Sequence, residues 1–219
     1  VELAQDGLNA IMVADTAVVV CEADENKALM VAPILKHLNA HGIPHILFIN
    51  KMDVSTGSVR GTFEALQAVA PRPLVLREIP IREGDDITGH VDLVSERAFE
   101  WQSGEEAKLI ELPEAIKDDE ELARTEMLES LADFDDTLLD NLLEDVIPSS
   151  EEIFANITKD LQENLIVPVF FGSAEQDSGV RRLMKSLRHD APDVATTAER
   201  LGLDGSATVA QVSKSIYAE

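Results

Sequence analysis

The pattern that most constrains the fold is a strand, a helix and a second strand joined by short links near the start of the chain. Two apolar runs rich in β-branched residues, Ala17–Cys21 and His45–Ile49, flank an amphipathic stretch from Lys27 to His41. Neither run alternates with polar residues, which is typical of strands buried on both faces. The pattern predicts a βαβ unit within a parallel sheet, where binding residues follow the carboxyl ends of the strands.

Composition limits the classes of function that remain. The 219 residues include 42 Asp and Glu against 18 Lys and Arg, a formal net charge of −24. Such a charge excludes a broad basic face for phosphate backbones, so we expect no direct DNA binding. The sequence has no apolar run long enough to cross a membrane, and its single cysteine, Cys21, is typical of a reducing compartment. We therefore expect a cytoplasmic protein without a membrane partner.

Polar residues follow the second apolar strand directly, in the run Asn50-Lys51-Met52-Asp53. Guanine presents two adjacent donors, N1–H and the 2-amino group, which one carboxylate accepts, and adenine has no such pair. Asp53 is the candidate carboxylate, and the stem of Lys51 would lie over the ring. The amide of Asn50 would contact the N7 side of the base and tie neighbouring loops together. The alternative is a strand-end turn in which Asp53 caps the next helix.

A second polar turn follows the predicted strand Leu165–Phe171 and has the sequence Gly172-Ser173-Ala174. The backbone N–H of Ala174 would meet guanine O6, where adenine carries a donor instead. The two turns together predict selectivity for guanine at both edges of the base. The predicted guanine-binding residues are Asn50, Lys51, Asp53, Ser173 and Ala174.

Four blocks of sequence carry a resemblance to a known family: Ile43–Asp53, Glu78–Trp101, Pro168–Val180 and Thr208–Tyr217. In this order they resemble the translational GTPases, and most closely the elongation factor G branch. The resemblance covers nearly the whole chain and implies an α/β fold with an incomplete P-loop GTPase-like parallel sheet. It also implies GTP or GDP as the ligand and a role for the parent protein in GTP-driven translocation on the ribosome.

The distance between the two turns predicts an insertion. Asp53 and Ser173 are separated by 119 residues, more than consecutive sheet elements need, and the intervening sequence has strand-like and then helical patterns. Together with the resemblance, this divides the chain into three parts. Residues 1–53 and 166–192 would form the C-terminal part of the GTP-binding domain, 54–165 an inserted acidic α+β subdomain, and 193–219 a linker and the first strand of a β-barrel domain.

Phosphoryl transfer requires parts that the sequence lacks. A G-x-x-x-x-G-K-[ST] loop cradles the phosphates and helps to bind Mg²⁺, and the 219 residues contain no such loop. The chain starts at Val1, and we interpret it as a fragment whose phosphate-binding and Mg²⁺-binding part lies upstream. On this interpretation the parent hydrolyses GTP. This chain alone has no catalytic residue and no metal ligand, is inactive, and contacts only the base.

One departure from the family leaves an alternative open. The family has a Gly-Gly-Val-Gln-Pro-like run after the first strand, whereas this chain has the polar run Asp24–Leu29. The departure favours a divergent paralogue of elongation factor G. The alternative function is a regulator that docks on the ribosome without hydrolysing GTP.

The predicted insertion is strongly acidic, with 16 acidic and 2 basic residues between Glu111 and Glu152. One interpretation is a solvated face that keeps the protein soluble. The other is a docking surface for a basic partner, and the resemblance implies the stalk protein of the large ribosomal subunit. The candidate contact residues are Glu126, Glu129 and Asp133.

Three smaller expectations complete the sequence analysis. The resemblance implies a phosphate-loop strand beside Ala17–Cys21, and without it this strand would have a bare edge through which the chain associates with itself. Trp101 is expected in the core of the insertion. His37, His41 and His45 recur at a spacing of four, but Gly42 and Pro44 interrupt the helix, so no metal site is expected.

Overall fold

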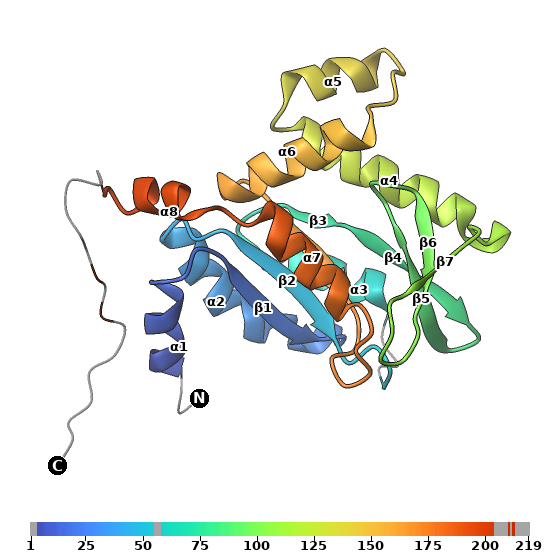
Figure 1. The fold of residues 1–219 in the computed structure, drawn as a ribbon, viewed down its shortest axis with the longest axis horizontal. Coiled ribbons are helices and arrows are strands. Elements are labelled where there is room, and N and C mark those ends of the chain that lie inside the picture. The colour runs from blue at the N-terminus through green and yellow to red at the C-terminus, as the bar shows by residue number, and fades with distance from the viewer. Residues whose placement is uncertain (1–3, 55–57, 204–209, 211, 213–219) are drawn as a thin grey trace.

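The computed structural model describes residues 4–54, 58–203, 210 and 212, and these residues form two four-stranded sheets with helices packed on them (Figure 1). The parallel sheet has the order β1-β2-β8-β3, with β1 (Ala17–Glu22), β2 (His45–Asn50), β3 (Leu74–Leu76) and β8 (Val167–Phe171). The antiparallel sheet contains β4 (Glu78–Glu83), β5 (Asp86–Asp92), β6 (Arg97–Glu100) and β7 (Lys108–Ile110), in that order. The expected α/β class with a parallel sheet is confirmed.

Helices cover both faces of the parallel sheet. The helices are α1 (Ala4–Ile11), α2 (Ala28–Ala40), α3 (Val59–Gln67), α4 (Lys117–Ala132), α5 (Asp136–Leu143), α6 (Ser150–Gln162), α7 (Val180–Asp190) and α8 (Val194–Arg200). On one face, Leu35 and Leu38 of α2 pack with Leu66 of α3 against the sheet. On the other face, Leu161 of α6 and Leu183 of α7 pack against the central strands. The core therefore lies between two helical layers, as the apolar strands predict.

Strand β1 differs from the expectation that it is buried on both faces. Ala17 and Val19 are buried, but Val20 is 57% exposed and Cys21 is only partly buried. The reason is its position at the end of the strand order, where β1 pairs with β2 alone among the described residues. Its apolar composition is typical of a parallel sheet, but an edge strand is covered less completely than a central one.

The stretch expected to form one strand, Leu74–Arg82, is divided between the two sheets. Its first part, β3, pairs in parallel with β8, and its second part, β4, pairs with β5. Arg77 joins them, because its N–H donates to Val169 O at 3.1 Å and its carbonyl accepts from Leu93 N at 3.1 Å. The expectation that residues 54–165 all lie outside the parallel sheet therefore does not hold for β3.

The antiparallel sheet has its own apolar core. Val91 and Leu93 pack with Leu131 of α4 and with Ile153 and Ile157 of α6. This arrangement has the strands first and the helices second, as expected for the insertion. Helix α6 begins with a capping box. The side chain of the N-cap residue, Ser149, accepts from the backbone N–H of Glu152, and the side chain of Glu152 accepts from the backbone N–H of Ser149. The strands and helices of residues 78–162 thus form a second packed layer beside the parallel sheet.

The end of the described chain contains a helix where a linker was expected. Asp193 caps α8 by accepting from Thr196 N at 2.8 Å, and Arg200 donates to Ala14 O at 3.0 Å. The expected barrel strand, Thr208–Tyr217, falls outside the described residues except for positions 210 and 212. Among the helices of the described part, none is long and apolar enough to span a membrane.

Candidate functional site

The two predicted turns lie at the same edge of the parallel sheet. Strands β2 and β8 are neighbours, with Ile49 opposite Phe171, so the residues that follow them emerge side by side. Two backbone hydrogen bonds join the turns, from Gly172 N to Ile49 O at 2.9 Å and from Met52 N to Gly172 O at 3.1 Å. Parallel pairing therefore brings together segments that are far apart in the sequence.

Asn50 links the two turns through its side chain. Its Oδ1 accepts a hydrogen bond from the backbone N–H of Ala174 at 2.9 Å. The sequence predicted that Asn50 would tie neighbouring loops together, and this contact does so. The backbone N–H of Ala174 was expected to donate to guanine O6, and in this structure it donates to Asn50. Guanine O6 would therefore have to share this N–H with Asn50 or displace the Asn50 side chain.

Lys51 adopts a left-handed backbone conformation with φ 64° and forms an ion pair with Glu22 at the end of β1. Lys27, from the polar run after β1, pairs with the same carboxylate. Hydrogen bonds from Lys27 and Lys51 lower the pKa of Glu22 to about 2. In this structure the Lys51 ammonium is therefore engaged at the sheet edge, and its stem is the part that remains for a base.

Asp53 is exposed in the turn after β2, so its carboxylate is accessible to a ligand. The alternative role, as the cap of the following helix, is not observed. Helix α3 is capped by Ser58, whose side chain accepts from Gly61 N at 3.2 Å. Because Ser58 and not Asp53 is the N-cap residue of α3, the helix-capping interpretation of Asp53 is wrong.

The loop after β8 is a closed backbone turn. Ser173 and Ser178 exchange two backbone hydrogen bonds of 2.9 Å each, and the side chain of Ser173 accepts from Gln176 N at 3.4 Å. A Cβ atom on Gly172 would lie 2.1 Å from Ser178 O, so only glycine fits this close approach. Gly179, with φ 74°, then turns the chain into α7. Ser173 is buried and Ala174 is exposed, so the loop presents its Ala174 end to solvent.

Sequence reasoning missed Glu78, which supports this loop from the second sheet. Its Oε1 accepts the N–H of Phe171 at 3.0 Å, and the side chain is fully buried. Burial raises the pKa of Glu78 to about 7. The available signal was a carboxylate at the start of an apolar strand, Glu78-Ile79-Pro80-Ile81, where a polar residue requires a partner.

Trp101 lies elsewhere than expected. Its indole N–H donates to Nδ1 of His90 at 3.0 Å, and its ring meets the edge of Phe171 at 6.0 Å between centroids. It packs against the core of the parallel sheet, not against the core of the insertion. Trp101 therefore bridges the two sheets close to the start of the Gly172 loop.

The three candidate stalk-contact residues are not equivalent. Glu126 accepts two hydrogen bonds from Arg60 of α3, at 2.9 and 2.7 Å, and so connects α4 to the parallel sheet layer. Glu129 and Asp133 are exposed and form no ion pair with any residue that the structure describes. Only these two are therefore available without breaking an existing contact.

A family profile and curated proteins are similar to this chain over most of its length. The sequence profile described as the elongation factor Tu GTP binding domain matches residues 4–193. The "Elongation factor G-like protein" of Synechocystis sp. is 46% identical over 220 residues, which cover 99% of this chain and 33% of that protein. "Elongation factor G" of Thermotoga petrophila is 29% identical over 180 residues, which cover 81% of this chain and 26% of that protein. The chain thus spans a third or less of the length of these curated relatives.

A solved structure of a Thermus thermophilus protein has a similar fold. It matches 89% of this chain and 29% of its own chain, with a TM-score of 0.76 and 24% sequence identity. At this identity the likeness concerns the fold alone. The profile match extends over most of the chain and includes both turns at the sheet edge. This chain therefore belongs to the family of the elongation factor Tu GTP-binding domain.

Proposed function

We propose that this chain is the guanine-recognising part of a ribosome-associated translational GTPase similar to elongation factor G. The observation that carries the proposal is the hydrogen bond between Asn50 and Ala174, which fixes two loops of guanine-reading sequence at one sheet edge. Asp53 is exposed beside them and supplies the carboxylate that N1–H and the 2-amino group of guanine require. Ser173, which is buried, holds the second loop in shape.

The residues present fit one half of GTP or GDP. The polar loops suit the base, whereas the sequence contains no glycine-rich loop with a following Lys-Ser or Lys-Thr for the phosphates. We therefore assign hydrolysis, and the Mg²⁺ ion that it uses, to the longer protein and not to this chain. The chain alone is inactive and binds the base weakly, whereas the longer protein acts in the cytoplasm during protein synthesis.

The base preference of the 219-residue chain tests this proposal. Ligand-observed NMR with guanosine, inosine and adenosine should show the tightest binding for guanosine and the weakest for adenosine. Inosine lacks the 2-amino donor, and adenosine lacks both the donor pair and the O6 acceptor. Asp53→Ala should abolish the preference for guanosine over inosine. Asp140→Ala, which removes an exposed carboxylate on α5, is the matched control and should leave the order unchanged. Equal binding of guanosine and adenosine to the unaltered chain would refute the assignment.

Within the same proposal, the acidic surface of α4 docks on the stalk protein of the large ribosomal subunit. Glu129 and Asp133 support this role because both are exposed and carry no ion pair with a described residue. The double variant Glu129→Lys/Asp133→Lys, made in the longer protein, should slow ribosome association most at low salt. Glu126→Lys is a poorer test because it also breaks the contact with Arg60. An unchanged association rate at low salt would remove the docking role.

The non-hydrolysing regulator remains the second candidate. It is favoured by the departure at Asp24–Leu29, because Lys27 of that run binds Glu22 and thereby shares a carboxylate with the base-site residue Lys51. The gene sequence upstream of Val1 separates the two candidates. A G-x-x-x-x-G-K-[ST] loop there would support hydrolysis, whereas a loop without its lysine would support the regulator.

Self-association through β1 is a further part of the proposal. Among the described residues, β1 pairs on one side only, and its exposed Val20 adds an apolar contact. Sedimentation velocity of the 219-residue chain over a range of concentrations should show a concentration-dependent larger species. A monomer at every concentration would contradict this.

A further inference from the structure

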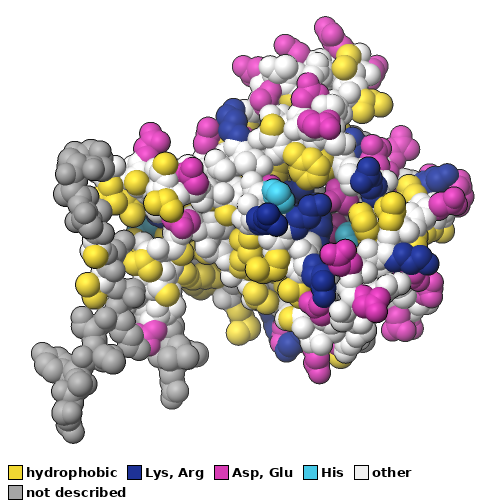
Figure 2. Space-filling view, in the orientation of Figure 1, with side chains coloured by type: hydrophobic (Ala, Val, Ile, Leu, Met, Phe, Trp, Pro, Cys, Tyr) yellow, Lys and Arg dark blue, Asp and Glu magenta, His cyan; other side chains and the backbone are white. Residues whose placement is uncertain are grey.

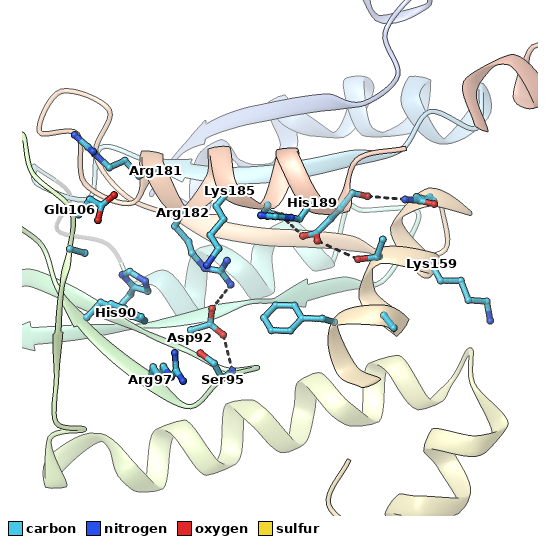
Figure 3. A pocket seen from close by; sticks show the side chains of 18 residues that line it. His90, Asp92, Ser95, Arg97, Glu106, Lys159, Arg181, Arg182, Lys185 and His189 are labelled. Carbon is cyan, nitrogen blue, oxygen red and sulfur yellow. Dashed lines mark hydrogen bonds and ion pairs between the residues drawn. The ribbon is translucent and has the colours of Figure 1, made fainter. Parts of the chain in front are cut away.

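A large cavity lies between the antiparallel sheet, α6 and α7 (Figure 3). Its volume is about 1030 Å³, and none of the five proposed guanine-binding residues lines it. Phe99 of β6 and Phe154 of α6, with Ala107 and Ala155, form the apolar part of its wall. Small-ligand pockets measure roughly 300–1,000 Å³, so this cavity also has room for several residues of a peptide.

The charge of the cavity is opposite to that of the chain. Five of the 18 Lys and Arg residues line it, compared with three of the 42 Asp and Glu residues. The basic residues are Arg97, Lys159, Arg181, Arg182 and Lys185, and the acidic residues are Asp92, Glu106 and Asp190. In Figure 2 this region is a dark blue cluster beside apolar surface, on a face that is otherwise dotted with acidic side chains.

Two of the three carboxylates are already engaged within the protein. Asp92 accepts from Arg182 and, at 3.0 Å each, from the backbone N–H groups of Val94 and Ser95. Asp190 accepts from the hydroxyl of Ser186 at 2.6 Å and from that of Thr158 at 3.3 Å. These carboxylates are therefore not free to pair with the remaining cations of the wall.

Several cations of the wall remain without a counterion. Arg97, Lys159 and Lys185 form no ion pair with any residue in the described part of the chain. Figure 3 shows Lys185 extending from α7 towards the side of the cavity formed by the sheet. Behind the wall, Arg77 is fully buried with Asp190 at 3.7 Å, and none of its guanidinium nitrogens has a hydrogen-bond partner among the described residues. The cavity is therefore a local region of uncompensated positive charge in a strongly acidic protein.

The apolar wall and the surrounding charge restrict the ligand. A simple inorganic anion would leave the surface of Phe99 and Phe154 uncovered. A nucleic-acid strand would extend beyond the cavity over a protein of net charge −24, which repels phosphates. A short peptide with carboxylates and one or two apolar side chains suits both the cations and the apolar side chains of the wall. Unlike a nucleic-acid strand, it places no further charge outside the cavity.

We infer that the cavity between β5, β6, α6 and α7 binds a short acidic and partly apolar peptide segment of a partner protein. An apolar side chain of the segment packs on Phe99 and Phe154, and its carboxylates pair with Arg97 and Lys185. This surface is distinct from the acidic face of α4. The cavity would select an acidic partner, whereas the face of α4 would select a basic one. The inference does not depend on guanine recognition.

Selection from a random peptide display library against the 219-residue chain tests the inference. Peptides with more than one Asp or Glu residue around an aliphatic or aromatic residue should be enriched. The enriched peptide, synthesised with a fluorescent label, should bind about tenfold more weakly to Lys185→Glu and to Arg97→Glu than to the unaltered chain. Added salt should weaken the binding.

Lys36→Glu provides the matched control. Lys36 is exposed on α2, outside the cavity, and its reversal changes the net charge by the same amount. This variant should retain peptide affinity within about twofold, because it leaves the wall of the cavity intact. All three variants should show the same thermal unfolding midpoint as the unaltered chain.

Four results would overturn the inference. The first is a selection without acidic enrichment, and the second is an equal loss of affinity in Lys36→Glu and Lys185→Glu. The third is tighter binding of a single-stranded RNA probe than of the enriched peptide, with the RNA affinity lost in Lys185→Glu. The fourth is a dimer, seen by sedimentation, that Lys185→Glu dissociates, because the occupant would then be a second copy of this chain.

Discussion

The carboxylate of Glu78 accepts a hydrogen bond from the backbone N–H of Phe171 at 3.0 Å, in the interior of the protein. Strand β3 ends at Leu76, which pairs with Val169, so the backbone of β3 does not reach Phe171. A side chain from the antiparallel sheet therefore completes the hydrogen bonding of the parallel sheet. It does so directly before the loop that begins at Gly172.

Glu78→Ala should destabilise the chain by roughly 1–3 kcal/mol, because it leaves the buried N–H of Phe171 without an acceptor. Urea unfolding at fixed pH measures this change. Glu83→Ala, at the exposed end of the same strand, is the control and should change the free energy of unfolding by less than about 0.5 kcal/mol. Equal effects of the two substitutions would show that the buried hydrogen bond contributes nothing.

Glu78 and His90 are buried neighbours whose pKa values are shifted in opposite directions. Because the indole N–H of Trp101 donates to Nδ1 of His90, the neutral ring carries its proton on Nε2, which lies 3.7 Å from Glu78 Oε2. Burial raises the pKa of Glu78 to about 7, and burial, followed by the charge of Arg182, lowers the pKa of His90 to about 4. The other charged groups that face the pair are Arg77, Asp92 and Arg182.

These pKa shifts predict opposite dependences of stability on pH. The raised pKa of Glu78 gives stability that is complete below pH 4.5 and is lost as the pH rises towards 7, because the folded state keeps a proton that the unfolded chain releases. The lowered pKa of His90 gives stability that is complete above pH 6.5 and is lost as the pH falls towards 4. Between these limits the two contributions offset each other in the unaltered chain.

Single substitutions should separate the two contributions. Relative to the unaltered chain, the free energy of unfolding of Glu78→Gln should rise with pH between about 4.5 and 6.5, by about 1.4 kcal/mol per pH unit. His90→Gln, which keeps an acceptor for Trp101, should show the reverse slope. Urea unfolding at half-unit pH intervals gives both profiles, and parallel profiles for all three proteins would show that this pair does not titrate as described.

Gly172→Ala should destabilise the chain by about 1–3 kcal/mol, because the new Cβ would stand 2.1 Å from the backbone oxygen of Ser178 and the closed loop would have to open. Gly7→Ala in α1 is a suitable control. Nothing lies within 4 Å of its added Cβ, so alanine should stabilise the helix by up to about 1 kcal/mol. Thermal unfolding of both variants distinguishes a local clash from a general effect of replacing glycine.

Asp53→Asn should change the base preference from guanine to xanthine. The amide then presents a donor where xanthine has a carbonyl, whereas guanine requires two acceptor sites at that edge. Competition between guanosine and xanthosine, followed by ligand-observed NMR, measures the change. Retained preference for guanosine would show that another residue reads this edge of the base.

The sequence predicted the parts of the molecule that depend on local patterns. Continuous apolar runs identified β2 and β8, and parallel pairing then implied that the polar turns that follow them would lie at one edge of the sheet. The profile match bears out the family that the motifs indicated. The roles of the five guanine-binding residues stay predictions, since they concern a ligand.

The remaining features depend on contacts that no local pattern contains. Arg77 belongs to both sheets, and nothing in the run Leu74–Arg82 marks where the chain leaves one sheet for the other. Glu78 is needed only because β3 is short, which follows from the position of that switch. Glu22 ends β1, and Lys51 follows β2. Because their ion pair joins two different strands, the periodicity of neither strand could predict it.

The order β1-β2-β8-β3 also determines how many copies could join. The sheet ends on one side in β3, which is only three residues long, and on the other in the six-residue β1. Within the described residues, β1 is thus the edge that offers enough backbone for pairing. Two copies that meet through β1 use the same surface twice and leave the parallel sheet without a further long edge, so assembly through this sheet ends at a two-fold symmetric pair.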